Sequence, residues 1–470
     1  MSRAVARIGV LITFLIGLDQ FARAAGPAAD QELGGVKEPK LSNPVTLQQT
    51  EALDPTIAVD ARSGTLYVAW ARRASGTGTA PLEVVVARSE NGGRSFTHPI
   101  AASGGDRDIA TATVAPPQIA VGPKGEVYVL YHRQVASKVF KRGRSIPRLT
   151  RSADGGERFA PAVDVTAREG IETSAAVTGL SIAPEGTVHV AWLDDRELLA
   201  RNELPADKRP EDAYWLNSDD PKVQVRVAHA GARDLRFGPS VLVADSASER
   251  SRIAIAADPH GPLYTAWRSK LDQFKDSYDA VRDILVAIST DGGTTWSKPV
   301  KVHDDRFKAG DCPELTIGIG IDAKGRLQVA WYTGSGVGPG VYYAASDDRG
   351  KSFSKPLALL TDTWVPYADV KLAVDGDDAA WVAFEDRRDD RAEQVTVVRI
   401  DRQGSVSPSK SWRGSAPDIA ARGNTAVLGP RPRSDLCKSL ARLIVRLAPD
   451  ARAKRISGQF MIVPLMRLNS

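Results

Sequence analysis

The sequence predicts an all-β fold, a β-propeller in which four-stranded antiparallel sheets repeat around a central axis. Two observations predict this fold. A pair of apolar strands joined by a Gly- or Asp-containing turn recurs at intervals of roughly 50–75 residues, the scale of one propeller blade. A second motif, S-x-[DN]-x-G-x-x-[WF], occurs four times at matching places within that repeat. Two independent patterns with one period indicate a single repeated unit.

The strand pair defines six clear units and a weaker seventh. The six are Pro55–Trp70, Pro117–Tyr131, Leu180–Trp192, Ile253–Trp267, Ile317–Trp331 and Val370–Phe384, and the weaker copy is Pro417–Gly429. A third apolar strand follows, as in Leu82–Ser89, and then a shorter fourth strand, as in Pro161–Val165. Four short strands with Gly at the turns, and no amphipathic helix of useful length, are typical of sheets repeated radially. One such sheet cannot bury both faces, but neighbours stacked around an axis can.

The second motif is expected to be the turn between the third and fourth strands. Its Asp or Asn can accept hydrogen bonds from backbone N–H groups of the turn, and its Gly supplies a positive φ. The aromatic residue is expected to pack over the turn at the edge of the sheet. The motif residues are therefore assigned a structural role: Ser89, Asn91, Phe96, Ser152, Asp154, Phe159, Ser289, Asp291, Trp296, Ser346, Asp348 and Phe353.

Composition excludes several classes of function. The chain has 470 residues, 42% of them hydrophobic, and a formal net charge of +5. That charge is too balanced to indicate nucleic-acid binding. Two distant cysteines, Cys312 and Cys437, and six scattered histidines give no metal-ligand spacing, although the cysteines could pair in an oxidising compartment. No nucleotide-binding motif appears, so neither a metal nor a cofactor is expected.

The N-terminus has the pattern of a secretory signal peptide, residues 1–24. Arg3 and Arg7 precede a short apolar run, and Ala22-Arg23-Ala24 resembles a cleavage site. A retained N-terminal anchor is the alternative. No other stretch is long enough to cross a membrane, so we expect a secreted or periplasmic protein, monomeric, with no membrane span after signal removal.

The propeller is expected to occupy residues 43–429. Asn43–Gln49 is predicted to supply the outer strand of the last unit and so close the ring, which would remove an exposed sheet edge. Residues 430–470 diverge from the repeat. They either hold the last strands of a seventh unit or form a separate closing segment, and the choice between six and seven blades stays open.

The four turns are similar to the Asp boxes of the sialidase-like β-propellers, the neuraminidase superfamily. The resemblance covers roughly residues 43–408. Box one has Asn91 instead of Asp, box four has Arg349 instead of the first Gly, and the third unit has His229–Phe237 where a box would lie. The resemblance implies a propeller that acts on terminal sialic acids. In that family three arginines bind the substrate carboxylate, a Tyr activated by a Glu is the nucleophile, and an Asp is the acid/base.

Part of this catalytic set has counterparts here. Tyr367 stands just before the first strand of a late unit, where the family has its Tyr. Glu249 precedes the first strand of a middle unit, and Arg268 ends the second strand of the same unit. The resemblance therefore implies Tyr367 as nucleophile, Glu249 as its activating base and Arg268 as one arm of the carboxylate clamp. Each also has a structural alternative: packing between blades for Tyr367 and ordinary ion pairs for the other two.

The rest of the catalytic set is missing from its expected places. Glu51–Val59 contains no arginine, Ala71–Pro81 contains no carboxylate, and Tyr332–Tyr343 contains no arginine. A ligand is expected at the ends of the second strands, where polar loops face the central channel. The candidate ligand-binding residues there are Asp195, Arg196, Trp215, Glu385, Arg387 and Arg388.

Two functions follow. The first is an exported propeller that recognises a glycan or glycoconjugate on this loop face, with exo-glycosidase hydrolysis of the sialidase type. The second is a non-catalytic propeller that binds a glycan or an envelope protein. The partial catalytic set keeps the first open, and the missing Asp and arginines favour the second.

Overall fold

The structure of the protein is a computed structural model whose contacts divide the chain into two units, Met1–Lys37 and Glu38–Ser470. The signal-peptide prediction lies outside the described residues. Among the described residues, no helix is both long and apolar enough to cross a membrane. The described residues are 39–41, 52–74, 81–111, 115–137, 143–197, 223–248, 251–270, 280–308, 317–335, 338–388, 394–429 and 445–449.

Seven antiparallel sheets form the blades of the second unit. Blade one comprises β2 (Ala52–Val59), β3 (Leu66–Arg73), β4 (Leu82–Ser89) and β5 (Ile100–Ala101). Blade two comprises β7 (Gln118–Val121), β8 (Val127–Val135), β9 (Arg144–Ser152) and β10 (Val163–Asp164), and β6 (Ile109–Ala110) also pairs with β8. Blade three comprises β11 (Thr178–Ile182), β12 (Val188–Asp194), β13 (Val223–Ala230) and β14 (Val241–Ala247).

The remaining blades repeat this order. Blade four comprises β15 (Ala254–Ala257), β16 (Leu263–Arg268), β17 (Ile284–Ser289) and β18 (Val300–Lys301). Blade five comprises β19 (Ile317–Ile321), β20 (Leu327–Thr333), β21 (Gly340–Ser346) and β22 (Leu357–Thr361). Blade six comprises β23 (Val370–Val374), β24 (Ala380–Asp386), β25 (Gln394–Ile400) and β26 (Lys410–Arg413). Blade seven comprises β27 (Ile419–Arg422), β28 (Thr425–Leu428), β29 (Val445–Pro449) and β1 (Pro39–Leu41).

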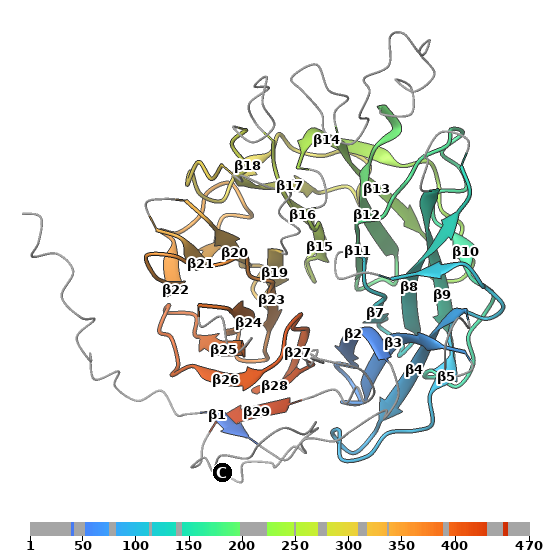
Figure 1. Ribbon diagram of the computed structural model, residues 1–470, viewed down its shortest axis with the longest axis horizontal. Coiled ribbons are helices and arrows are strands. Elements are labelled where there is room, and N and C mark those ends of the chain that lie inside the picture. The colour runs from blue at the N-terminus through green and yellow to red at the C-terminus, as the bar shows by residue number, and fades with distance from the viewer. Residues whose placement is uncertain are drawn as a thin grey trace, which may run out of the picture. The chain divides into compact units, whose positions relative to one another are not determined.

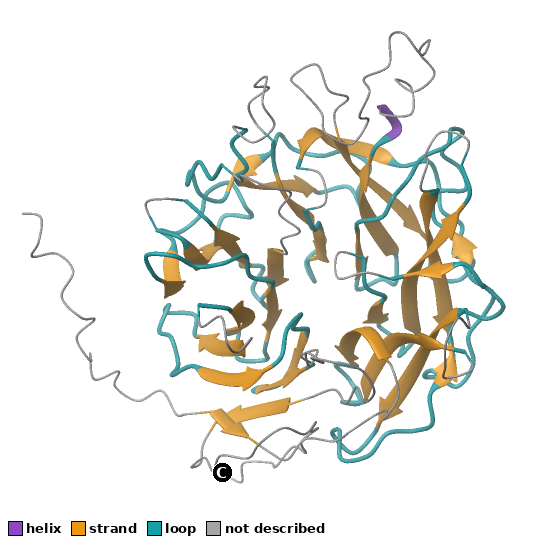
Figure 2. Ribbon diagram, in the orientation of Figure 1, coloured by secondary structure: helices purple, strands orange, loops and turns teal. Residues whose placement is uncertain are grey.

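The blades form a closed ring. The innermost strands contact one another in the order β2, β7, β11, β15, β19, β23 and β27, and β27 returns to β2 (Figure 1). Strands and loops make up almost all of the described chain, apart from a short helical stretch after β12 (Figure 2). The predicted all-β propeller is therefore confirmed. The six clear units each form a sheet, and the weaker copy is the inner half of a seventh.

Both ends of the second unit complete blade seven. β1 is its outer strand and pairs with β29, Leu41 lying opposite Leu447. The predicted closing strand, Asn43–Gln49, lies outside the described residues, and the outer strand that is described comes slightly earlier in the chain. The inner edge of the blade is fixed to blade one, because the Asp418 carboxylate accepts hydrogen bonds from Thr56 Oγ1 and Ile57 N, both at 2.8 Å. Pairing of β29 with strands on both sides leaves it no open edge.

The second strand of each of blades one to six forms the core. It lies between the first and third strands of its own sheet and between two neighbouring blades, so apolar residues are buried on both of its faces. Five tryptophans on these strands are at most 2% exposed: Trp70, Trp192, Trp267, Trp331 and Trp381. This burial explains why the repeat is most visible in the sequence at this strand.

The four Asp-box turns share one hydrogen-bond pattern. In box three, Ser289 Oγ donates to Asp291 Oδ1 at 2.7 Å and accepts from Gly293 N at 2.8 Å, and Asp291 Oδ1 also accepts from Thr295 N at 2.9 Å. Box one makes the same bonds with Asn91. The four aromatic residues are half-buried against the blade clusters: Phe96, Phe159, Trp296 and Phe353. The turns thus tie the third strand of a blade to the fourth.

Candidate functional site

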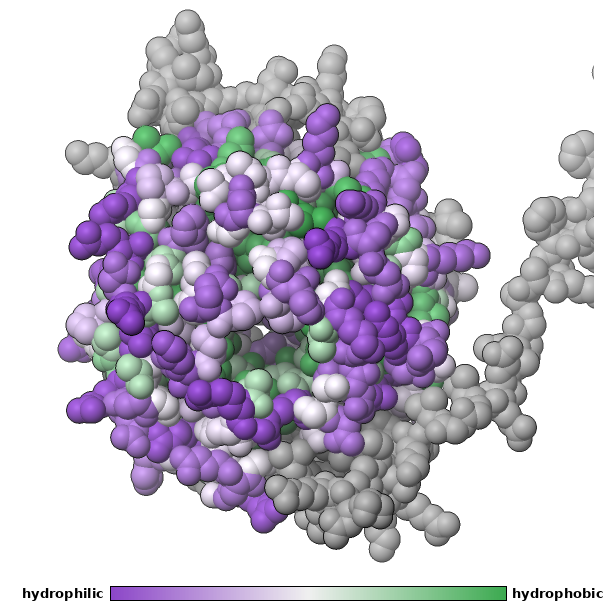
Figure 3. Space-filling view, turned by 180° about the vertical axis from the view of Figure 1, so that it is seen from behind, coloured by the Kyte–Doolittle hydropathy of each residue, from purple (hydrophilic) through white to green (hydrophobic). Residues whose placement is uncertain are grey.

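Strand direction separates two faces of the ring. In each of blades one to six, the end at which the third strand turns into the fourth also carries the turn between the first and second strands. The opposite end, here called the loop face, carries the connections between the second and third strands and between blades. Figure 3, seen from behind the view of Figure 1, shows a hollow at the centre of the ring, with hydrophobic and weakly polar residues around it and hydrophilic residues over most of the surrounding surface. Ligands of a closed ring are expected near such a hollow.

Tyr367 lies on the loop face where blade five leads into blade six. It is 37% exposed, and its ring meets that of Tyr332 edge to face, with centroids 5.7 Å apart. Tyr332 is itself buried and donates a hydrogen bond from its hydroxyl to Val365 O at 2.7 Å. The loop that carries Tyr367 is therefore fixed to the end of β20, and Tyr367 has one wet and one packed side.

Arg268 lies beneath the same tyrosine pair. At the end of β16 it is 1% exposed, and its guanidinium donates to Tyr332 O at 2.6 Å and to Arg282 O at 2.8 Å. The guanidinium also lies 5.2 Å from the centroid of the Phe307 ring. Burial lowers the pKa of Arg268 to about 10, so it stays charged at neutral pH. Arg268 and Tyr367 thus share Tyr332 as a neighbour, with Arg268 engaged by backbone carbonyls.

Two acidic residues of blade six form buried ion pairs beside Tyr367. Asp369 pairs with Arg252 at 3.4 Å, and Glu385 pairs with Arg387 at 2.7 Å. Glu385 also accepts hydrogen bonds from Asp369 N at 3.3 Å and Ala416 N at 2.6 Å. Burial raises the pKa of Glu385, and the negative charge of Asp369 raises it further. Because Arg252 leads into blade four, its bond to Asp369 spans blade five and ties three blades together at the loop face.

The outer part of this site is an exposed rim. Arg388 holds the Asp386 carboxylate through Nε at 2.9 Å and Nη2 at 2.8 Å, and its Nη1 lies 3.4 Å from Asp362. Trp364, two residues after Asp362, is the most exposed large hydrophobic residue in the described part of the chain, at 59%. The loop-face ends of blades four, five and six, with this rim, are called the channel mouth below.

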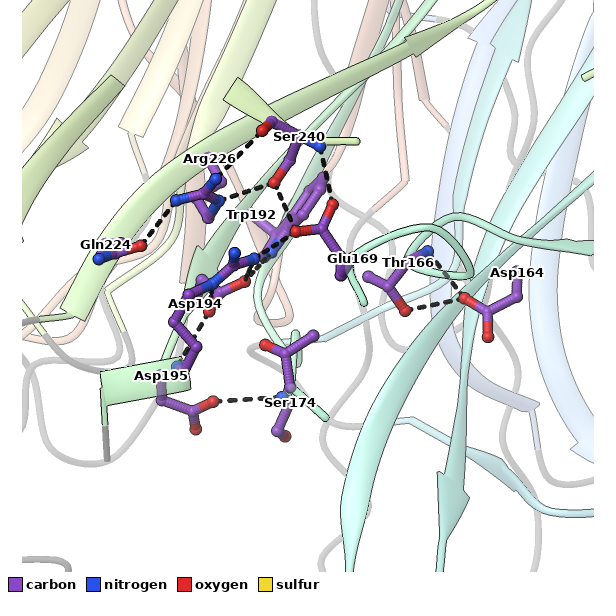
Figure 4. Close-up of polar contacts among 12 residues, drawn as sticks. Asp164, Thr166, Glu169, Ser174, Trp192, Asp194, Asp195, Gln224, Arg226 and Ser240 are labelled. Atoms are coloured by element: carbon purple, nitrogen blue, oxygen red, sulfur yellow. Dashed lines mark hydrogen bonds and ion pairs between the residues drawn. The ribbon is translucent and has the colours of Figure 1, made fainter. Parts of the chain in front are cut away.

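The predicted residues of blade three form a different, internal network (Figure 4). Arg196 donates to both oxygens of the buried Asp194 at 2.8 Å and also pairs with Glu169. Glu169 in turn accepts from Ser240 N and Oγ, both at 2.8 Å. No sequence pattern points to this network, because Glu169 and Ser240 are far from Arg196 along the chain. Arg196 therefore holds the connection before β11 against β14.

Asp195 lies beside this network and bonds elsewhere. Its carboxylate accepts a hydrogen bond from Ser174 N at 3.2 Å. Burial, and then the charge of Asp194, raise the pKa of Asp195 to about 7. Such a carboxyl can exchange a proton at neutral pH, which suits an acid/base group as well as a structural one.

Four predicted residues lie outside the described residues: Trp215, Glu249, Cys312 and Cys437. Ser248, the residue before Glu249, is buried and donates from its backbone N to Arg268 O at 2.8 Å. The pairing of Glu249 with Tyr367 stays a prediction. The described residues contain no cluster of three or more His, Cys, Asp or Glu side chains able to hold a metal ion.

Three residues of the channel mouth were not predicted from the sequence: Arg252, Trp364 and Asp369. Arg252 and Asp369 are 117 positions apart, and only the ring brings them together. Trp364 could have been noticed, because it stands in a polar loop between Thr363 and Val365 instead of ending a strand as most tryptophans of this chain do.

Comparison with known proteins supports the fold. No protein-family profile matches the chain, and no curated protein matches it in sequence. A polysaccharide lyase, an ulvan lyase bound to a GlcA–Rha3S saccharide, is similar in structure, with a TM-score of 0.50 and 10% identity over 88% of this chain and 95% of that one. Solved structures with lower TM-scores include a Hadza microbial sialidase (0.45, 13% identity, 89% of this chain and 91% of that one) and the intramolecular trans-sialidase from Ruminococcus gnavus (0.40, 14%, 86% and 96%). At such identities the likeness concerns the fold, and the chain is a sialidase-like β-propeller in architecture.

Proposed function

We propose that the protein recognises a glycan at the channel mouth. The observation that carries this proposal is the position of Tyr367, half-exposed at the mouth and packed on Tyr332, which Arg268 supports from below. A ligand site needs aromatic and polar groups that are already fixed before the ligand arrives, because ordering them on binding would cost affinity. Tyr367 and the paired groups of Asp369 and Glu385 meet that requirement.

The charges around Tyr367 are held in place by one another. Asp369 and Glu385 are 7% and 2% exposed, and each has an arginine partner. Ion pairs this buried contribute little net stability but define geometry, since breaking one leaves an uncompensated charge. They give the mouth a rigid floor on which hydroxyl-rich ligands can find both donors and acceptors.

The second candidate function is hydrolysis of a terminal sugar by a sialidase-type mechanism. Its support is the proximity of Tyr367 and Arg268 through their common neighbour Tyr332. In this reaction the Tyr367 hydroxyl attacks the anomeric carbon and Glu249 accepts its proton, while an acid from another loop protonates the leaving oxygen. Secretion or export to the periplasm belongs to the same proposal, as does an envelope protein as the alternative partner.

Binding and turnover must be measured separately. Wild-type protein is tested against a glycan array and against fluorogenic glycosides, together with Tyr367→Phe and the control Tyr342→Phe. Tyr342 is a suitable control because its hydroxyl donates to Gly338 O within its own blade. Hydrolysis that falls roughly 10²–10⁴-fold only in Tyr367→Phe supports the glycosidase. Binding without turnover supports the non-catalytic form, and the absence of both in the wild type would refute glycan recognition.

A further inference from the structure

The loop between β22 and β23 exposes two aromatic side chains close together. Only four large hydrophobic side chains stand exposed in the described part of the chain: Ile171, Leu242, Trp364 and Tyr367. The two aromatic members are three residues apart, so their Cα atoms lie at most about 10 Å apart. Contiguous exposed apolar surface on a soluble domain commonly marks a binding site. We call this pair, Trp364 and Tyr367, the aromatic platform.

The platform is fixed by the residues between and beside its two members. Val365 is 3% exposed, and its carbonyl accepts a hydrogen bond from the Tyr332 hydroxyl. Ala368, on the far side, is 1% exposed within the same hydrophobic cluster. The loop therefore turns Trp364 and Tyr367 outward while the intervening backbone is anchored. A ligand that stacks on them meets surfaces that need little further ordering.

We propose that the aromatic platform binds successive sugar rings of a neutral glycan chain that continues outward from the channel mouth. This inference rests on the proposed function and adds the class of ligand. Aromatic rings offer an apolar face to the C–H side of a pyranose, and a polar border can bond its hydroxyls. The border is present: Asp362 and Thr363 are exposed next to Trp364, and Arg388 lies within reach of Asp362.

The neutral charge of the ligand follows from the arginines near the platform. Each has a carboxylate partner in the protein: Arg252 with Asp369, Arg387 with Glu385, and Arg388 with Asp386 and Asp362. An anionic sugar would have to compete with these internal carboxylates for the same guanidinium groups. Removing a buried carboxylate from its cation leaves that carboxylate unpaired, which discriminates against an acidic ligand.

The test is binding of oligosaccharides of increasing length, followed by calorimetry and by tryptophan fluorescence. The probes are neutral hexose oligosaccharides of two to six sugars and uronate-containing oligosaccharides of the same lengths. The variants are Trp364→Ala, Trp364→Phe and, as a matched loss of exposed apolar surface elsewhere, Ile171→Ala. Thermal unfolding verifies that each variant is folded.

We expect the wild type to gain affinity for neutral chains as they lengthen. Trp364→Ala should bind the longer chains roughly 10- to 100-fold more weakly, the range expected when one large aromatic surface is no longer buried. Trp364→Phe should recover most of the loss, and Ile171→Ala should bind as the wild type does.

Two results would overturn the platform while leaving the proposed function intact. One is equal affinity of Trp364→Ala and wild type for every chain length, and the other is tighter wild-type binding of the uronate chains. A wild type that binds no glycan of any length would overturn the proposed function itself, so the two failures are distinguishable.

Discussion

Box four contains a strained residue whose replacement should stabilise the protein. Arg349 has a φ of 61°, in the left-handed region, where the other boxes have Gly92, Gly155 and Gly292 at 71°, 67° and 70°. A non-glycine residue in that conformation costs roughly 1–2 kcal/mol. Arg349 is exposed, so Arg349→Gly removes that strain without opening a cavity.

The expected gain is smaller than the strain itself. Glycine loses more backbone entropy on folding, which offsets about 0.5–1 kcal/mol. The net expectation for Arg349→Gly is therefore a stabilisation of about 0.5–1 kcal/mol. The matched control is the reverse change, Gly292→Ala in box three. An added Cβ at Gly292 meets nothing within 4 Å, so its cost of about 1 kcal/mol or more is purely conformational.

Urea unfolding followed by far-ultraviolet circular dichroism measures both changes. Arg349→Gly should raise the midpoint and Gly292→Ala should lower it, both without a change in the slope with denaturant. If Arg349→Gly were neutral or destabilising while Gly292→Ala behaved as expected, backbone strain could not be the main effect of Arg349 on stability. Some contact of the Arg349 side chain would then have to be worth more than the strain.

Three further predictions concern buried polar groups. Arg196→Ala should destabilise the protein by about 3–5 kcal/mol, because Asp194 and Glu169 would be left buried without their cation; a loss of glycan binding at unchanged stability in urea would instead assign Arg196 to the ligand. Because Asp195 has a pKa raised to about 7 in the folded state, the folded protein binds more protons than the unfolded chain between about pH 4 and 7, and stability should fall as pH rises through that window. Asp195→Asn should flatten this decline, which amounts to at most about 4 kcal/mol between unfolding curves at pH 4 and pH 8, and an unchanged pH profile would contradict the assignment. Ser289→Ala should cost about 1–3 kcal/mol, since it leaves the buried N–H of Gly293 without its acceptor, and calorimetric unfolding of Ser289→Ala beside Ser289→Thr would show whether the hydroxyl is responsible.

Much of the fold could be predicted because the repeat is encoded in local patterns. The second strands are buried on both faces, so their apolar runs and terminal aromatic residues recur in each unit. The Asp boxes depend on contacts between residues a few positions apart, as between Ser289 and Asp291, so they too are visible in a short window. Blade seven was harder to predict, because β1 and β29 come from opposite ends of the chain and neither repeats the pattern.

The candidate site was predictable only in part. Tyr367, Arg268, Glu385 and Arg387 were named because resemblance or strand ends pointed to them, and the first two do share a neighbour in Tyr332. Their partners were not predictable. The carboxylates that occupy Arg196 and Arg387, and the link from Arg252 to Asp369, depend on which loops meet across blade boundaries.

The sequence by itself determined that this protein is a ring of four-stranded blades, because strand burial and turn geometry are short-range properties that repeat with the chain. Only the tertiary structure decided which charges are engaged and which aromatic surfaces face solvent. Closing the ring brings the ends of blades four, five and six together, and pairing there takes up arginines that the sequence alone presents as available. Trp364 and Tyr367 stay exposed at that mouth because the same packing buries the residues beside them.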